Sequence, residues 1–186
     1  LYVFSKSKRK KDIGTILLGL GMIFFGMNTM ETTLSPLKDM PQFTNLFFVF
    51  SNPFFGMLLG MIMTAILQSS SASVGILQAL SSTGAITFST AVPIILGQNV
   101  GKCITVILAS IGSKRDAKRV VFIDVLNNII GLVIFFVAVY GLNYIVQFSF
   151  WDSIVNRGDI ANFHTFFNIG TTIVLLPFVN IIIKIS

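Results

Sequence analysis

A run of polar side chains inside an apolar segment carries the clearest chemical signal in the chain. The run follows the apolar stretch Pro53–Leu67 and consists of Gln68, Ser69, Ser70 and Ser71, with Ser73 close behind. Serine hydroxyls can donate hydrogen bonds to an oxyanion, and a glutamine amide offers both donors and an acceptor. These residue types predict a site for a small polar ligand. The alternative is close packing of small residues, with the serines bonded back to the preceding helical turn.

A second polar group interrupts a later apolar stretch. The segment reads "PIILGQNVGKCITVIL", and its candidate binding residues are Gln98, Asn99 and Lys102. Gly97 and Gly101 each disfavour a regular helix by about 1 kcal/mol. We therefore expect a membrane span over residues 90–112 that is unwound at its centre, where free carbonyls coordinate a cation. The alternative is a glycine kink that allows close packing of helices.

The elements that must position these residues are membrane helices. The chain of 186 residues is 54% hydrophobic and 11% charged, whereas an ordinary soluble domain is about 25% charged. Further apolar runs at residues 13–36, 120–147 and 160–184 are long enough to cross a bilayer, which takes about 20 residues. The composition predicts an all-α polytopic membrane protein. One cysteine and one histidine are too few for a disulfide or a multi-histidine metal centre.

The apolar stretch before the first polar run is short for a membrane span. Asn52-Pro53 is a helix-start signal, and a helix from there to Leu67 is about 22 Å long, less than the ~30 Å of the hydrocarbon core. We therefore expect a re-entrant helical hairpin over residues 53–83 with the polar run at its tip. One continuous helix to about Leu80 is the alternative.

Two clusters of basic residues set the expected orientation. They lie in residues 1–12 and 113–119, each beside an apolar run, so we interpret them as cytoplasmic orientation signals rather than as a nucleic-acid surface. Placing both on one side requires an even number of crossings between them. An outward span at 13–36, a hairpin that does not cross and an inward broken span at 90–112 satisfy this condition. Residues 120–147 and 160–184 then cross out and back.

Broken helices in a membrane expose helix ends that can bind ions. Free N–H groups at a helix start attract anions, and free carbonyls at a helix end attract cations. Ser70 and Ser71 are expected to cap the returning helix of the hairpin. Lys102 is costly at mid-membrane depth, so we expect it to pair with a bound anion, with helix-end carbonyls or with a carboxylate such as Asp124.

The segments "NPFFGMLLGMIMTAILQSSSASVGILQAL", "ILGQNVGKCITVILASIG" and "IANFHTFFNIG" resemble the type II sodium-dependent phosphate cotransporter family in its bacterial branch. The resemblance implies one half of an inverted-repeat transporter of the bacterial cytoplasmic membrane, not an enzyme and without a cofactor. It places phosphate and sodium at Gln68, Ser69, Ser70 and Ser71 with Gln98 and Asn99. The sodium candidates are Gln68, Ser70 and Asn99. The expected partners are the other repeat half, membrane lipid and, as an alternative assembly, a homodimer.

One departure from the family pattern concerns Lys102. The family's break usually has two threonines after its second glycine, and here Lys102 and Cys103 stand there. An ammonium could replace one sodium ion or contact phosphate, so the number of coupled sodium ions is left open. Other readings of the chain are a transporter of sulfate or a carboxylate, a non-transporting phosphate-binding regulator, and an intramembrane hydrolase with a serine nucleophile.

Overall fold

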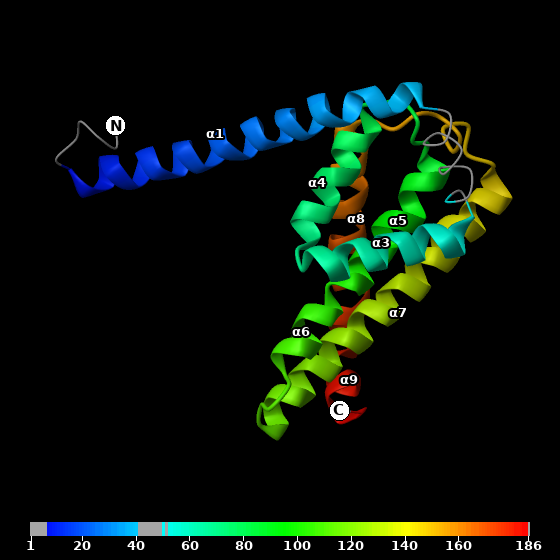
Figure 1. Ribbon diagram of the computed structural model, residues 1–186. Coiled ribbons are helices and arrows are strands. Elements are labelled where there is room, and N and C mark those ends of the chain that lie inside the picture. The colour runs from blue at the N-terminus through cyan, green and yellow to red at the C-terminus, as the bar shows by residue number, and fades with distance from the viewer. Residues whose placement is uncertain (1–6, 41–49, 51, 186) are drawn as a thin grey trace.

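The computed structural model describes residues 7–40, 50 and 52–185 (Figure 1). Within these ranges the regular elements are helices, and the only strand-like pairing is an isolated bridge between Thr87 and Ile154. The part of the predicted cytoplasmic segment before Ser7 lies outside the described residues. In chain order the elements are α1 (Lys8–Leu34), η1 (Ser35–Asp39), α3 (Pro53–Leu67), α4 (Ser70–Ser81), α5 (Phe88–Gly101), α6 (Cys103–Ala109), α7 (Arg115–Val146), α8 (Arg157–Leu175), η2 (Leu176–Phe178) and α9 (Val179–Ile185).

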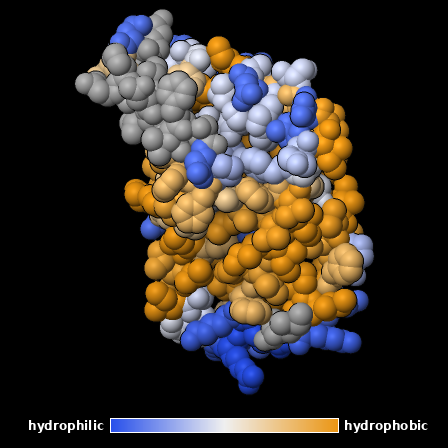
Figure 2. All heavy atoms as spheres, turned by 90° about the vertical axis from the view of Figure 1, so that its right-hand side faces the viewer, coloured by the Kyte–Doolittle hydropathy of each residue, from blue (hydrophilic) through white to orange (hydrophobic). Residues whose placement is uncertain are grey.

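The surface of the bundle has the character of a membrane protein. Figure 2 shows an apolar band between two hydrophilic ends, and the strongly hydrophilic lower end is the one where α6 joins α7 in Figure 1. Among the described residues, four segments are long and apolar enough to cross a membrane, namely Lys8–Leu34, Phe88–Ala109, Arg115–Val146 and Arg157–Lys184. A band of this kind favours lipid over water. The chain is an all-α polytopic membrane protein, as its composition predicts.

Some helices extend beyond the predicted boundaries. Residues 8–12 form the first turns of α1, and residues 115–119 belong to α7 instead of a basic loop over 113–119. Lysine and arginine are good helix formers, and Asp116 in the first turn of α7 complements the helix dipole. The predicted span 160–184 begins earlier, at Arg157, and η2 interrupts it around Pro177, which has no N–H to donate.

Helix α1 leans away from the other helices. Figure 1 shows it projecting sideways from the bundle, and none of its described residues is buried. It contacts α4, and Glu31 near its C-terminal end forms an ion pair with Arg157 at the start of α8. The helix is long enough to cross a membrane, but it does not lie alongside α7 and α8. The even number of crossings between the basic clusters therefore stays a prediction.

The most extensive helix contact in the described chain joins α3 to α5. Small residues spaced four apart face each other across it, and they are Gly56, Gly60 and Thr64 on α3, and Pro93, Gly97 and Gly101 on α5. A Cβ atom on Gly60 would collide with the Ile94 carbonyl oxygen, and one on Gly97 would collide with the Met57 carbonyl oxygen. Small residues at this spacing let two membrane helices touch backbone to backbone. They hold the two polar groups on neighbouring helices.

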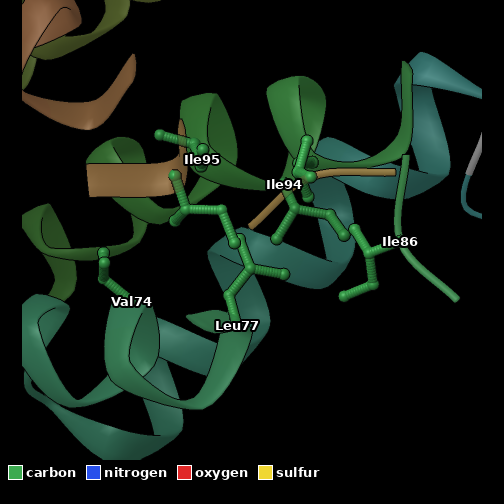
Figure 3. Close-up of a cluster of buried hydrophobic side chains, with 8 residues drawn as sticks. Val74, Leu77, Ile86, Ile94 and Ile95 are labelled. Atoms are coloured by element: carbon green, nitrogen blue, oxygen red, sulfur yellow. The ribbon is translucent and has the colours of Figure 1, made fainter. Parts of the chain in front are cut away.

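Two apolar clusters keep α5 at the centre of the bundle. In the first, Val74 and Leu77 of α4 lie against Ile94 and Ile95 of α5, with Ile86 closing one side (Figure 3). In the second, the other face of α5 packs on α7 and α8 through Val92, Leu96, Phe135 and Phe167. Every residue from Thr90 to Asn99 is buried as a result. The polar residues at the end of α5 are thus carried on the most enclosed helix of the described chain.

Candidate functional site

The first polar run lies at the junction of α3 and α4. Gln68 ends α3 in the left-handed conformation (φ 50°), and Ser69 is extended (φ −149°). The Ser69 hydroxyl accepts a hydrogen bond of 3.2 Å from the Ala72 N–H, so Ser69 is the N-cap of α4. The expectation that Ser70 and Ser71 form the cap is wrong, because the helix begins one residue earlier than that assignment requires.

Removing this cap gives a direct test of the junction. We expect Ser69→Ala to lower the free energy of unfolding by about 1 kcal/mol, because the Ala72 N–H loses its acceptor. Thermal unfolding of the purified protein in detergent measures the loss. Ser71→Ala is the matched control, since Ser71 is exposed in the same first turn of α4 and no hydrogen bond of its hydroxyl is found in the described chain. Equal melting temperatures for the two variants would rule out the cap.

The junction presents polar groups at the middle of the bundle. Figure 1 shows α3 and α4 meeting about half-way between the bundle's two ends, with α4 running along the bundle and α3 crossing it. Gln68 and Ser71 are exposed, Ser69 and Ser70 are half-buried, and Ser73 is fully buried. The start of α4 leaves N–H groups without helical acceptors, as every helix start does. That the two helices enter and leave a membrane by one side stays a prediction.

Two hydroxyl groups near the junction are buried without a partner. The Oγ1 of Thr64 and the Oγ of Ser73 have no hydrogen bond within the described residues, and both residues are 0% exposed. Sequence reasoning selected Ser73 and missed Thr64. Thr64 continues the Gly56, Gly60 spacing and precedes Gln68 by one helical turn. That spacing was the available signal, because it places Thr64 on the face of α3 that meets α5.

The second polar group lies on α5, and its break is narrower than predicted. Residues 97–101 are helical, and the helix is interrupted only at Lys102, between α5 and α6. The expected unwinding across the whole polar group is therefore wrong. Glycine is needed at positions 97 and 101 because α3 packs closely against the backbone of α5. A Cβ atom on Gly101, for example, would lie only 2.8 Å from the Cβ of Thr64. The alternative of glycines used for close packing is the one that the structure supports.

Gln98 is the most unusual polar residue of the described chain. Its side chain is 0% exposed, and neither Nε2 nor Oε1 has a hydrogen-bond partner there. An amide buried without a partner costs about 1 to 3 kcal/mol. The neighbouring Asn99 is also buried, but its Nδ2 donates a hydrogen bond of 3.0 Å to the Ile95 carbonyl. Gln98 thus has an unused donor and an unused acceptor in the interior.

Lys102 stands at the interruption between α5 and α6. It is half-buried, and its carbonyl accepts a hydrogen bond of 2.6 Å from the Thr105 hydroxyl. No ion pair of Lys102 is found in the part of the chain that the structure describes. The predicted carboxylate partner, Asp124, instead accepts from the Asn128 amide through Oδ1 at 3.3 Å, and its carbonyl accepts from the same group at 2.8 Å. The ammonium of Lys102 is left without a carboxylate among the described residues.

The two polar groups are carried on adjoining helices without a direct bond between them. Thr64 of α3 contacts α5 at Gly101. A Cβ atom added to Gly60 of α3 would lie 3.0 Å from the backbone nitrogen of Gln98. The contact between α3 and α5 therefore ends near Thr64 and Gly101, and Lys102 follows Gly101 in the chain. No hydrogen bond within the described ranges joins Gln68, Ser69, Ser70, Ser71 or Ser73 to this end of α5. His164, also half-buried, bonds instead to Asn168 of its own helix, at 3.3 Å.

Fold and site together define a class: a multi-pass α-helical membrane protein with discontinuous helices and with interior polar groups that have no partner in the described ranges. Residues 40–151, which include both polar groups, match the family described as Na+/Pi-cotransporter. The chain belongs to the Na+/Pi-cotransporter family. No solved structure matches it.

Named relatives agree with this membership. The chain is 31% identical over 179 residues to the uncharacterized protein YqeW of Bacillus subtilis, covering 94% of this chain and 56% of that protein. It is 32% identical over 117 residues to the human sodium-dependent phosphate transport protein 2B, covering 59% of this chain and 17% of that protein. It is 24% identical over 176 residues to the putative inorganic phosphate export protein YjbB of Escherichia coli, covering 94% of this chain and 32% of that protein. The chain thus spans about half the length of YqeW and less of the others.

Proposed function

We propose that the chain forms part of a secondary active transporter that moves inorganic phosphate with sodium across the bacterial cytoplasmic membrane. The observation that carries the proposal is the amide of Gln98, which is buried on α5 and has no hydrogen-bond partner among the described residues. Family membership and the names of the phosphate-transporting relatives support the substrate. The chemistry of helix ends explains how such a substrate is held.

Phosphate would be bound at the start of α4. Free N–H groups at a helix start, together with serine hydroxyls, suit an oxyanion. Gln68, Ser70 and Ser71 supply the side chains, while Ser69 fixes the helix start. Gln98 of α5 adds an amide donor, and Lys102 between α5 and α6 adds an ammonium. A dianion in a membrane interior needs this density of donors, because burying an unpaired charge is costly.

Sodium would be coordinated by oxygen atoms of the same region. The candidates are the side-chain oxygens of Gln68, Ser70 and Asn99, with Gln98 Oε1 as a further unused acceptor. Sodium beside phosphate lowers the cost of bringing both ions into the membrane. We propose that a second repeat unit supplies the facing wall and that the site opens alternately to each side. The exposure of Gln68 and Ser71 supports this, since they have nothing opposite them in the described residues.

Flux measurements on the full-length protein test the proposal. In proteoliposomes, uptake of labelled phosphate is expected to rise when an inward sodium gradient replaces an equal potassium gradient. Sodium-independent uptake would remove the coupling, and an absence of phosphate flux would remove the substrate. Excess sulfate or a carboxylate competes with phosphate only if another oxyanion is the substrate. Phosphate binding without flux would indicate a regulator, and flux should be followed outward as well, because YjbB is named as an exporter.

Lys102 provides a second test of the coupling. We expect Lys102→Thr to make uptake more steeply dependent on sodium concentration, because a hydroxyl that can bind sodium replaces a fixed ammonium. The initial rate of phosphate uptake against sodium concentration measures the change. Lys114→Thr is the control, since Lys114 is exposed at the hydrophilic end of the bundle. Identical sodium curves for wild type and Lys102→Thr would contradict the proposed role.

A further inference from the structure

A pocket lined by aromatic rings lies at the end of the bundle opposite the α6–α7 turn. Its volume is about 400 Å³, and it is lined by Phe88, Phe150, Asp159, Asn162, Phe163 and Phe166. The α7–α8 loop, gold in Figure 1, lies at this end. Helix α8 begins a membrane-length segment at Arg157, so its first turns mark the boundary between water and lipid. Aromatic side chains are enriched at that boundary.

The pocket has the chemistry of a site for an organic ammonium group. Four phenylalanine side chains line this open pocket, and the faces of aromatic rings attract ammonium cations. Its one charged lining residue is Asp159. Asp159 Oδ2 accepts a hydrogen bond of 2.9 Å from the Asn156 N–H, whereas Oδ1 has no hydrogen bond or ion pair among the described residues. The charge of the pocket thus favours a cation and disfavours an anion.

The nearby arginine does not neutralise this carboxylate. Arg157 forms its ion pair with Glu31 of α1, and its carbonyl accepts a hydrogen bond of 3.1 Å from the Gln78 amide. The arginine side chain is therefore paired with α1, and no ion pair between Arg157 and Asp159 is found among the described residues. Asn162, exposed at the pocket's edge, adds an amide that can donate to a phosphate oxygen.

An exposed apolar stripe leads from the pocket along α8. It begins one helical turn after Asn162 and consists of Phe166, Ile169 and Ile173 of α8 and Leu176 at the start of η2, each more than half exposed. The residues recur at helical spacing on one side of α8, so the stripe runs from the membrane boundary into the apolar band. Its length and direction fit an acyl chain whose headgroup sits in the pocket.

We propose that this pocket binds the headgroup ammonium of a zwitterionic phospholipid, phosphatidylethanolamine, with an acyl chain along the stripe of α8. The ammonium lies among the rings against Asp159, and the phosphate lies at Asn162. An anionic lipid such as phosphatidylglycerol has no cation for the carboxylate and is repelled by it. The proposal does not depend on which substrate the protein transports.

Competition between two lipids tests the site. The full-length protein in detergent is incubated with equal amounts of phosphatidylethanolamine and phosphatidylglycerol that carry the same acyl chains, and bound lipid is counted by native mass spectrometry. We expect about fivefold preference for phosphatidylethanolamine, of the size that a cation–π contact at an open site supports. Equal binding of the two lipids, or preference for phosphatidylglycerol, would overturn the proposal.

Three variants separate the pocket from general surface charge. Asp159→Asn should remove most of the preference, and its amide oxygen can still accept from the Asn156 N–H. Phe166→Leu should lower the preference about twofold without unfolding the protein, because Phe166 is 62% exposed. Asp152→Asn is the matched control, an exposed carboxylate of the α7–α8 loop outside the pocket. Loss of preference in Asp152→Asn, or its retention in both other variants, would overturn the assignment.

Discussion

Phosphate uptake should fall at least tenfold when Gln98 is replaced by methionine, while the protein becomes more resistant to heating. The loss is expected because a hydrogen bond to a charged ligand contributes about 1.5 to 3 kcal/mol, which corresponds to roughly 10- to 100-fold in binding. The gain in thermal stability is expected because both polar atoms of the buried amide have no partner in the described chain. This lack of partners destabilises the folded protein by about 1 to 3 kcal/mol. Methionine fills a similar volume without polar demands.

The two readouts must move in opposite directions for the role to hold. A purely structural glutamine would give a variant that is less stable and transports less. Thr171→Val is the matched control, since the Thr171 Oγ1 on α8 is also buried without a partner among the described residues but lies against Gly131 of α7, away from the proposed site. That variant should gain stability and keep its uptake. Unchanged uptake in Gln98→Met would remove Gln98 from the site.

The sequence allowed the break between α3 and α4 to be predicted because local signals mark it. Asn52-Pro53 starts a helix too short to span, and polar residues follow where it ends. The N-cap was misplaced by one residue because it depends on the backbone of Gln68, whose left-handed conformation (φ 50°) no residue type in the run demands. The local sequence pattern thus predicts the two helices and the break between them, but it does not predict which of the adjacent serines is the N-cap.

The second polar group shows where local reasoning fails. Glycine disfavours a helix when nothing else intervenes, but Gly97 and Gly101 meet the backbone of α3, more than thirty residues earlier in the chain. Two glycines four residues apart are therefore compatible with an unwound segment or with a packed helix. Which of the two forms depends on the contact with α3, which the sequence of α5 alone does not contain. The direction of α1 relative to the other helices could not be predicted from the sequence either, because basic clusters indicate a side of the membrane and not a packing partner.

Gly97→Ala should destabilise the protein strongly, by about 3 kcal/mol, although alanine is the better helix former. A Cβ atom at this position meets the Met57 carbonyl oxygen, the carbonyl carbon at 2.7 Å and the Cα at 2.8 Å, all of them backbone atoms. Backbone cannot rotate aside as a side chain can, so α3 and α5 must separate along their whole contact. Overpacking of this kind costs about 1 to 3 kcal/mol and occasionally more. Thermal unfolding in detergent measures it.

The glycine at position 141 distinguishes packing from helix propensity. Gly141 lies in α7, and no described residue outside its own helical turns comes within 4 Å of its Cβ position, so Gly141→Ala should be neutral or stabilising by up to about 1 kcal/mol. An unwound segment at Gly97 would have no neighbouring backbone to displace, and alanine there would leave the melting temperature unchanged. Similar melting of the two variants would therefore favour the unwound segment over the packed helix. A large drop confined to Gly97→Ala would show that the backbone contact with α3 holds Gln98 in the interior.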